Sequence, residues 1–190
     1  MGTANILTDR LVLRGWVSDD REPFAVMNAD PKVMEHFPSV LNRGESDELV
    51  DRVVEDFEAH GFGLWALEVR ENGRFIGFTG LSVPAFEASF TPAVEVGWRL
   101  APGTWGKGYA TEAATAALEF AFSRAGLEEV VSFTSVENTR SHTVMQRLGM
   151  PHDQNDDFEH PRIEVGQRLR AHVVYRISRP GWRARAAGYL

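Results

Sequence analysis

Short runs in which apolar and polar residues alternate recur along the chain, and each run predicts a strand. The run "TDRLVLRGW" places Leu11 and Leu13 between polar neighbours, which is the period-two pattern of a half-buried strand. Two longer runs are joined through Asn72-Gly73, and an Asn-Gly pair between such runs predicts an antiparallel hairpin. The predicted strands are residues 8–16, 62–70, 74–83, 93–100, 129–136 and 171–178, with a further short strand near Phe158.

A spacing of three to four residues between apolar positions predicts helices elsewhere. In the segment "GESDELVDRVVEDFEAHG", Leu49, Val53 and Phe57 recur at helical spacing and Gly61 follows as a stop signal. An alanine-rich segment ends in the same way before Gly126. The predicted helices are residues 18–30, which open with the cap-type residue Ser18, and residues 44–61, 109–125 and 138–149.

The order of these elements predicts a single α/β domain. A strand, two helices and three strands, followed by helix, strand, helix and strand, describe a mixed sheet with helices packed on it. Residues 94–136 should form a right-handed crossover between parallel strands. We expect one domain over residues 1–190, with its core at about 6–178 and a partly ordered tail at 179–190.

Composition narrows the classes of function. The 190-residue chain is 43% hydrophobic and 25% charged, as in soluble globular domains, and no apolar run approaches the roughly 20 residues of a membrane-spanning helix. We therefore expect a cytoplasmic protein that binds no membrane. A net charge of −7 argues against broad binding of nucleic acids. Cysteine is absent, and no metal is expected, because ligand-like spacing is missing from His36, His60, His142, His152 and His172.

The stretch "APGTWGKGYATEA" (101–113) places Gly106, Gly108 and Ala110 between a predicted strand and a predicted helix. Such a connection presents free backbone N–H groups and the positive end of the helix dipole, which is an anion site that small residues leave open. A simpler interpretation is that the glycines only make a tight turn. Two other phosphate loops fit poorly. "GKGYAT" lacks the Gly-Lys-Ser/Thr ending of a P-loop, and Thr111 stands where a dinucleotide-binding loop has its third small residue.

Two motifs together carry a resemblance to a known family. "GWRLAPGTWGKGYATEA", followed by "VENTRSHTVMQRLGM", resembles the acetyl-coenzyme A signature of the GNAT N-acetyltransferase superfamily, and most closely its ribosomal-protein alpha-amino acetyltransferase-like (RimJ/RimL-like) branch. With "LTDRLVLRGW", the resemblance covers most of residues 6–178. The family pattern is Arg/Gln-x-x-Gly-x-Gly/Ala, and Trp105 stands next to the first glycine, where Gln or Arg often occurs.

The resemblance implies an α/β (α+β) fold. Its central sheet is mixed, mostly antiparallel and twisted, with helices on both faces. A parallel strand pair, here residues 94–100 and 130–136, splays apart at the acetyl-CoA site, and the thioester lies in the gap.

The resemblance also implies how acetyl-CoA is held as the co-substrate. Backbone groups of Trp98 and Leu100 pair with the pantetheine arm as an added strand would, and the amides from Gly106 through Ala110 hold the pyrophosphate. Asn138 faces the pantetheine from the other side, and Arg140 contacts a nucleotide phosphate. The implied cofactor-binding residues are Trp98, Leu100, Trp105, Gly106, Lys107, Gly108, Tyr109, Ala110, Asn138 and Arg140. No metal is implied.

The implied reaction is direct attack of an amine on the thioester, which needs a base for the amine proton and an acid for the departing thiolate. Many family members place a Tyr in the helix after the Asn as the acid, whereas this chain has Val144 and Met145 in that neighbourhood. The alpha-amino acetylating branch resembles this chain in having Ser three residues after the Asn. We predict Ser141 as the acid, against an alternative in which it only caps or packs the helix.

Three residues are candidates for the base. Glu95 lies between Val94 and Val96 on the strand that enters the cofactor site, as either a base acting through water or a solvated strand residue. Glu159 and His160 stand where the related branch carries an acidic residue facing the substrate. His has a suitable pKa, but we place Glu159 ahead of His160. The predicted catalytic residues are Ser141, Glu95 and Glu159.

The leading interpretation is an enzyme that acetylates a primary amine of a protein N-terminus or a small molecule. The alternative is a non-catalytic acyl-CoA-binding or sensing module, and a nucleotide-phosphate enzyme is disfavoured by the loop sequence. Family members suggest a monomer or a homodimer paired through the final strands. About one in three of five aromatic residues are expected in the acceptor pocket, namely Phe37, Phe62, Trp65, Phe86 and Phe90.

Overall fold

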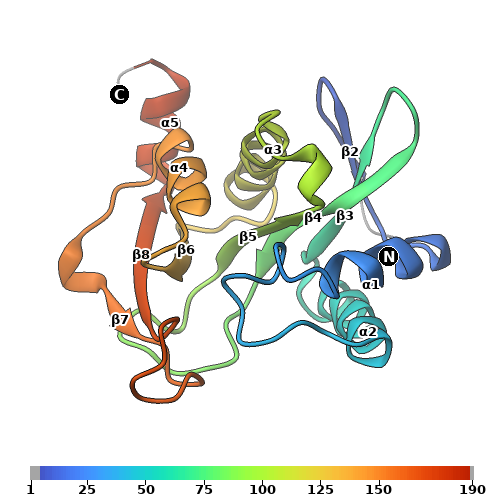
Figure 1. Cartoon of the computed structure of the whole chain (residues 1–190). Helices are drawn as coiled ribbons and strands as arrows, with labels where there is room; N and C mark the ends of the chain where they lie inside the picture. Colours follow the sequence, from blue (N-terminus) through green and yellow to red (C-terminus); the bar gives the residue numbers. More distant parts are fainter. Residues whose placement is uncertain (1–4, 189–190) are drawn as a thin grey trace.

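The structure, a computed structural model, describes residues 5–188 and is built on one eight-stranded sheet (Figure 1). The strand order is β1-β2-β3-β4-β5-β6-β8-β7. Every neighbouring pair is antiparallel except β5 and β6, which are parallel, so the predicted mixed and mostly antiparallel sheet is confirmed. The strands are β1 (Ile6–Leu7), β2 (Leu11–Arg14), β3 (Leu64–Val69), β4 (Arg74–Ser82), β5 (Glu95–Leu100), β6 (Glu129–Ser135), β7 (Phe158–Glu159) and β8 (Ala171–Ser178).

The helices follow the predicted segments, with one addition at the C-terminus. They are α1 (Arg21–Asn28), α2 (Arg43–His60), α3 (Tyr109–Ser123), α4 (Thr139–Arg147) and α5 (Arg179–Ala186), with short 3-10 turns at η1 (Ser18–Asp20), η2 (Pro102–Thr104) and η3 (Gln154–Asp156). Gly61 ends α2 in the left-handed conformation (φ 72°), as predicted. Ser18 does not cap a helix. It lies within η1, where the Asp20 carboxylate accepts the N–H of Val17.

Helices cover both faces of the sheet. The larger apolar cluster lies between the sheet and α3, and includes Val96 and Leu100 of β5. A second cluster joins α1 and the start of α2 to the sheet through Phe78, whose ring lies near the guanidinium of Arg99. Because successive residues of β5 point to opposite faces, the two clusters lie on opposite sides of the sheet.

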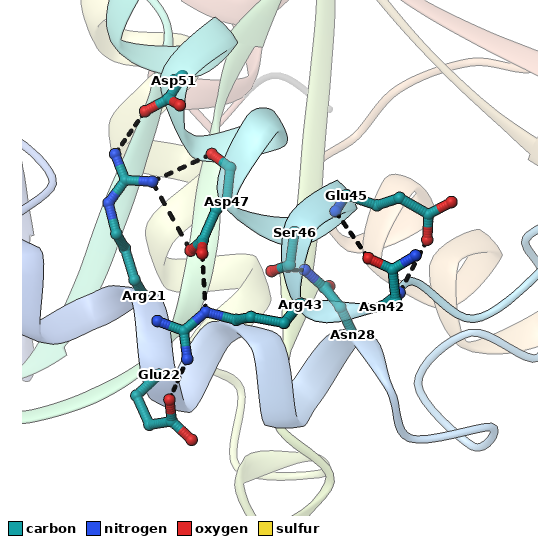
Figure 2. A network of polar contacts seen from close by, with 9 residues as sticks. All are labelled: Arg21, Glu22, Asn28, Asn42, Arg43, Glu45, Ser46, Asp47 and Asp51. Atoms are coloured by element: carbon teal, nitrogen blue, oxygen red, sulfur yellow. Dashed lines mark hydrogen bonds and ion pairs between the residues drawn. The ribbon is translucent and has the colours of Figure 1, made fainter.

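A network of charged side chains fastens α1 to α2 (Figure 2). Arg21 of α1 contacts Asp47 and Asp51 of α2, and Arg43 of α2 contacts Glu22 of α1. These pairs lie at the surface. Beneath them, α1 and α2 are also joined by a buried hydrogen bond between two neutral side chains, which is described further below.

The parallel pair at the centre of the sheet is barely paired. Only Glu95 of β5 and Val131 of β6 are in register, and the N–H of Val131 donates to the carbonyl of Val94 (2.9 Å). In contrast, β6 pairs with β8 along its whole length. The two strands therefore separate beyond Glu95, which confirms the predicted splay.

The tail was expected to be only partly ordered, and this expectation is wrong for residues 179–186. They form α5, whose N-cap Ser178 accepts the N–H of Gly181 (3.3 Å). Trp182 is 4% exposed, and its indole N–H donates to Glu119 of α3 (2.9 Å). Burial of this large aromatic side chain stabilises the helix in a way that the polar composition of the segment does not suggest. Residues 189–190 lie outside the described part of the chain.

Candidate active site

The loop between β5 and α3 has the backbone of an anion site. Gly106 and Gly108 have φ angles of 74° and 81°, which side chains rarely permit, and α3 starts at Tyr109. Among the described residues, the N–H groups of residues 106–111 find no acceptor. A Cβ added at Gly106 would meet open space. The cradle of free N–H groups at the helix start thus fits a pyrophosphate, beyond what a tight turn requires.

A side-chain network holds this loop from behind. The guanidinium of Arg10 donates to the carbonyl of Lys107 (2.8 Å) and to the carboxylate of Glu112 in the first turn of α3 (2.6 Å). Thr8 donates to the same carboxylate (2.6 Å). Burial by itself would raise the pKa of Glu112, but the hydrogen bonds from Thr8 and Arg10 outweigh it and lower the pKa below its ordinary value. This network explains why the segment "LTDR" accompanies the loop sequence in the resemblance: its side chains support the loop.

A cavity of about 670 Å³ runs from the loop along the free edge of β5 and into the gap beside β6. All the predicted site residues line it except Lys107 and Glu159. The side chain of Lys107 is exposed, and its contribution to the loop is its backbone. The splayed strands and the phosphate cradle therefore belong to one continuous space.

The backbone of β5 is oriented as the resemblance implies. The N–H of Ala101 donates to the carbonyl of Ile76 in β4 (2.9 Å), so alternation turns the backbone groups of Trp98 and Leu100 away from β4, toward the gap. The carbonyl of Leu100 is already engaged, because the indole N–H of Trp105 donates to it (2.7 Å). An extended ligand in the gap would find the backbone of Trp98 and the N–H of Leu100.

Asn138 and Arg140 lie at the start of α4, on the opposite wall of the gap. The side chain of Asn138 caps the helix by accepting the N–H of Ser141 (3.2 Å), and it donates to the hydroxyl of Thr134 (2.9 Å). The guanidinium of Arg140 lies over the ring of Trp105 (4.4 Å to the centroid), so it bridges the gap above the loop. Both positions suit a ligand that enters between the two strands.

Glu95 begins β5 at the point where β5 and β6 separate. It is the one carboxyl group among the described residues that line the cavity. Burial raises its pKa to about 8, and a hydrogen bond from Ser82 (3.3 Å) opposes the rise only in part. A carboxyl group with a pKa near neutrality is suited to accept a proton at physiological pH.

The two other base candidates separate in space. Glu159 points away from the cavity, with 61% of its side chain exposed, and forms an ion pair with Arg170 (2.8 Å). His160 lines the cavity, and burial together with the charges of His172 and Arg162 lowers its pKa to about 4. Of these two residues only His160 lines the cavity, and the ranking of Glu159 and His160 as bases stays a prediction.

Ser141 points into the cavity from the first turn of α4. Its N–H is engaged by Asn138, so the backbone of Ser141 has a structural partner. Its hydroxyl has no hydrogen-bond partner in the described part of the chain. The hydroxyl is thus free for a ligand, as the acid role requires.

The five aromatic residues considered for the acceptor pocket lie in different parts of the structure. Phe37 lines the cavity. Trp65 is 1% exposed in the main core, and Phe62 packs against that core. Phe86 and Phe90 belong to a small apolar cluster on the far side of β6 and β8 from α3. One of the five is therefore at the cavity and four pack in apolar clusters, close to the expected one in three.

Arg99 was not predicted as a site residue from the sequence, and His36 and His172 were considered only as metal ligands. All three line the cavity, and the rings of His160 and His172 lie 4.9 Å apart. No group of three or more possible metal ligands occurs within residues 5–188. Strand periodicity could have indicated Arg99 as a site residue, because Arg99 is four residues from Glu95 and so shares its face of β5.

Comparison with known proteins agrees with this arrangement. A sequence model of the acetyltransferase (GNAT) domain matches residues 10–151. The FsC-acetyl coenzyme A-N(2)-transacetylase of Aspergillus fumigatus is 37% identical over 130 residues, which are 64% of this chain and 52% of that protein. The acetyltransferase from Agrobacterium tumefaciens str. C58 has a TM-score of 0.74 at 25% identity, over 93% of this chain and 95% of that chain.

A more distant structure shares the fold. RimJ from Mycobacterium smegmatis, solved in complex with CoA-disulfide, has a TM-score of 0.71 at 17% identity, over 94% of this chain and 90% of that chain. None of the helices within residues 5–188 combines the length and the hydropathy that crossing a bilayer requires. The expected cytoplasmic location stays a prediction. On the domain match and the geometry of the site, the chain belongs to the GNAT acetyltransferase family and is an acetyl-CoA-dependent acyltransferase.

Proposed function

We propose that this protein is an N-acetyltransferase that moves the acetyl group of acetyl-CoA to a primary amine by direct attack. The observation that carries the proposal is the placement of Glu95, whose pKa of about 8 suits a base, in the same cavity as the free N–H groups of residues 106–111. The relative from Aspergillus fumigatus is named as an N-transacetylase that uses acetyl-CoA, which supports nitrogen as the attacked atom.

The chain's own residues divide the task. The loop amides and the β5 edge hold the coenzyme so that its thioester lies in the gap. Glu95, directly or through a water molecule, accepts a proton from the acceptor's ammonium group, so that the neutral amine can attack the carbonyl carbon. The carbon–sulfur bond breaks, and Ser141 is placed to donate its hydroxyl proton to the departing sulfur. The attacking nitrogen loses its second proton to the Ser141 oxygen, directly or through water, which restores the hydroxyl. Two protein groups thus manage the protons, and a metal is not needed.

We further propose that the protein belongs to the RimJ/RimL-like branch of the family. The motif around Ser141 resembles the RimJ/RimL-like enzymes, and the fold of Mycobacterium smegmatis RimJ is compatible with that branch. We therefore include protein N-termini among the acceptors to be tested, beside small-molecule amines. The monomer or homodimer suggested by family members stays a prediction.

Thiol release tests the proposal against the sensing alternative. Acetyl-CoA is mixed with the protein and a panel of N-terminal peptides, polyamines, amino acids and aminoglycosides, and free thiol is followed with a thiol-reactive dye. Amine-dependent release establishes the transferase. Binding of acetyl-CoA by calorimetry, with no release for any amine, would instead favour a non-catalytic acyl-CoA sensor.

Replacing Ser141 tests the acid. In Ser141→Ala, we expect kcat to fall about tenfold or more, because a positioned proton donor contributes typically 10²–10⁴-fold and water can replace part of it. The dissociation constant of acetyl-CoA should change little, since the capping hydrogen bond of residue 141 uses its backbone N–H. A variant with the wild-type kcat would remove Ser141 from the mechanism and leave it as a packing residue. Gln146→Ala, at an exposed position of the same helix outside the cavity lining, is the control.

A further inference from the structure

Arg99 is a half-buried cation that lines the cavity. It lies on the same face of β5 as Glu95, with Gly97 between them. Its guanidinium lies over the ring of Phe37 (4.1 Å) and near that of Phe78 (5.5 Å). Burial lowers its pKa to about 10, which leaves the group charged at neutral pH.

The partners of Arg99 are neutral. One terminal nitrogen (Nη1) donates to Oδ1 of Asn28, which is fully buried (2.7 Å). The amide nitrogen of Asn28 donates in turn to the hydroxyl of Ser46, also fully buried (2.9 Å; Figure 2). This chain of hydrogen bonds, clamped between α1 and α2, fixes the oxygen of Asn28 toward Arg99 and holds the guanidinium in one orientation.

No negative charge offsets this cation. Within the described residues Arg99 forms no ion pair, and its Nε is buried without an acceptor. A largely desolvated charge that lacks a counter-ion is unfavourable, and an anion in the cavity would stabilise it through the terminal nitrogen Nη2, which is not among the buried unpaired atoms. The hydrogen bonds that orient Arg99 are already made within the protein. The remaining side of the guanidinium faces the cavity.

The charges of the residues that line the cavity also favour an anionic ligand. Among the described lining residues the only carboxyl group is Glu95, whose raised pKa keeps it largely protonated at pH 7. Burial lowers the pKa of His36, His160 and His172, so these rings are mostly neutral. The cationic lining residues are Lys32, Arg99, Arg140, Arg147 and Arg162. A polyamine would be repelled there, whereas an anionic group would be attracted.

We propose that Arg99 binds an anionic group of the acceptor, so that the substrate is a primary amine that also carries a carboxylate or a phosphate. This inference rests on the proposed N-acetyltransferase function. The Cα atoms of Glu95 and Arg99 are about 13 Å apart, at about 3.3 Å for each strand residue. The amine must reach the gap near Glu95 while the anion pairs with Arg99. The acceptor is therefore extended, with its two charged groups on different carbons.

Matched amines test the inference. Thiol release from acetyl-CoA is measured with ω-amino carboxylates from glycine to aminohexanoate, with their primary amides, and with aminoalkyl phosphates of the same lengths. Rates are expressed per concentration of unprotonated amine, because the neighbouring group changes the basicity of the amine. We expect kcat/KM for the best anionic chain to exceed that of its amide at least tenfold. The carboxylate and phosphate series then show which anion is preferred.

Variants test whether Arg99 causes the preference for anionic over amide substrates. Arg99→Gln should reduce the ratio of anionic to amide substrate to about one, through KM. Asn28→Asp keeps Arg99 and its hydrogen bond but supplies an internal counter-ion, so it should lower the same ratio even if Arg99→Gln does not fold. Arg52→Gln, an exposed position of α2 with the same change in charge, should keep the wild-type ratio. A ratio near one in the wild type, or a ratio that survives in both site variants, would overturn the inference.

This inference and the proposed function fail in different ways. If amides and acids are acetylated equally, transfer to amines stands and the role of Arg99 falls. If no amine releases thiol although CoA binds, the proposed function falls, and Arg99 is tested by calorimetry of the same acids and amides on the CoA-bound protein. Tighter binding of the acids, lost in Arg99→Gln, would then support the anion site. Equal binding would refute it.

Discussion

Glu95→Gln should lower kcat/KM for amine acetylation by about 10²–10⁴-fold, the range that general-base catalysis typically contributes. Glutamine keeps the shape of the side chain and can still bond Ser82, but it cannot accept the amine proton. The dissociation constant of acetyl-CoA should stay close to that of the wild type, because the coenzyme contacts that we propose lie at the loop and the β5 backbone. Steady-state kinetics and calorimetry measure the two quantities separately.

The pH dependence gives Glu95 a signature of its own. Since the base must be ionised, the wild-type kcat/KM should rise with pH through the pKa of about 8 and level off above it. In Glu95→Gln this step should vanish, apart from any step due to the amine itself, which a matched amine of lower basicity displaces. A wild-type profile that is flat between pH 6 and 9 would contradict the assignment of Glu95 as the base.

Stability supplies an independent test of the same pKa. The folded state holds the proton of Glu95 more tightly than the unfolded state, where the ordinary pKa is 4.5. The wild type should therefore lose free energy of unfolding as pH rises from about 4.5 to about 8, relative to Glu95→Gln. Thermal unfolding of both proteins across that range measures the difference. Parallel curves would show that burial does not raise this pKa.

Gly108→Val should raise the dissociation constant of acetyl-CoA about 100-fold. A side chain in the left-handed region costs roughly 1–2 kcal/mol, and a valine is especially disfavoured there. Relaxing that strain moves the amides of the loop, and losing one charge-assisted hydrogen bond removes a further 1.5–3 kcal/mol or so. Together these terms amount to about 3 kcal/mol, which corresponds to about two powers of ten in affinity.

The control for Gly108 lies in the same connection. Gly103 is exposed in η2, has no positive φ, and an added Cβ would come no closer than 3.9 Å to the end of Arg74. Gly103→Val should therefore leave coenzyme affinity unchanged. Calorimetry measures both variants, and circular dichroism confirms that each is folded. Equal affinities for Gly108→Val and the wild type would show that the cradle does not hold the pyrophosphate.

Local patterns were sufficient to predict most of the fold. The apolar alternation at 171–178 predicted β8 with the bounds that the structure shows, and the Asn72-Gly73 turn predicted the β3–β4 hairpin. The phosphate loop was equally readable, because positive φ angles at Gly106 and Gly108 leave a direct mark on residue type. Each of these features is determined by residues that are close in sequence.

The cavity was harder to predict, because it is assembled from distant segments. Glu159 and His160 are adjacent in sequence, yet only His160 lines the cavity, since pairing of β7 with β8 turns successive side chains to opposite faces. The orientation of Arg99 depends on Asn28, which Ser46 holds in place only once α1 and α2 are packed together. Trp182 likewise gives no local helix signal, because its stabilisation comes from Glu119 in another helix.

The near absence of pairing between β5 and β6 also divides the hydrogen bonding of the sheet into two ladders, although one apolar core packs against both. Strands β1 to β5 form one hydrogen-bonded ladder and β6, β8 and β7 form another, and the two ladders pair only at Glu95 and Val131. Amides in the two ladders should therefore exchange with solvent at different rates in the free protein, through separate opening events. A coenzyme lying between the strands bonds to both walls. It should slow exchange in the two ladders together and so make the two ladders unfold as one.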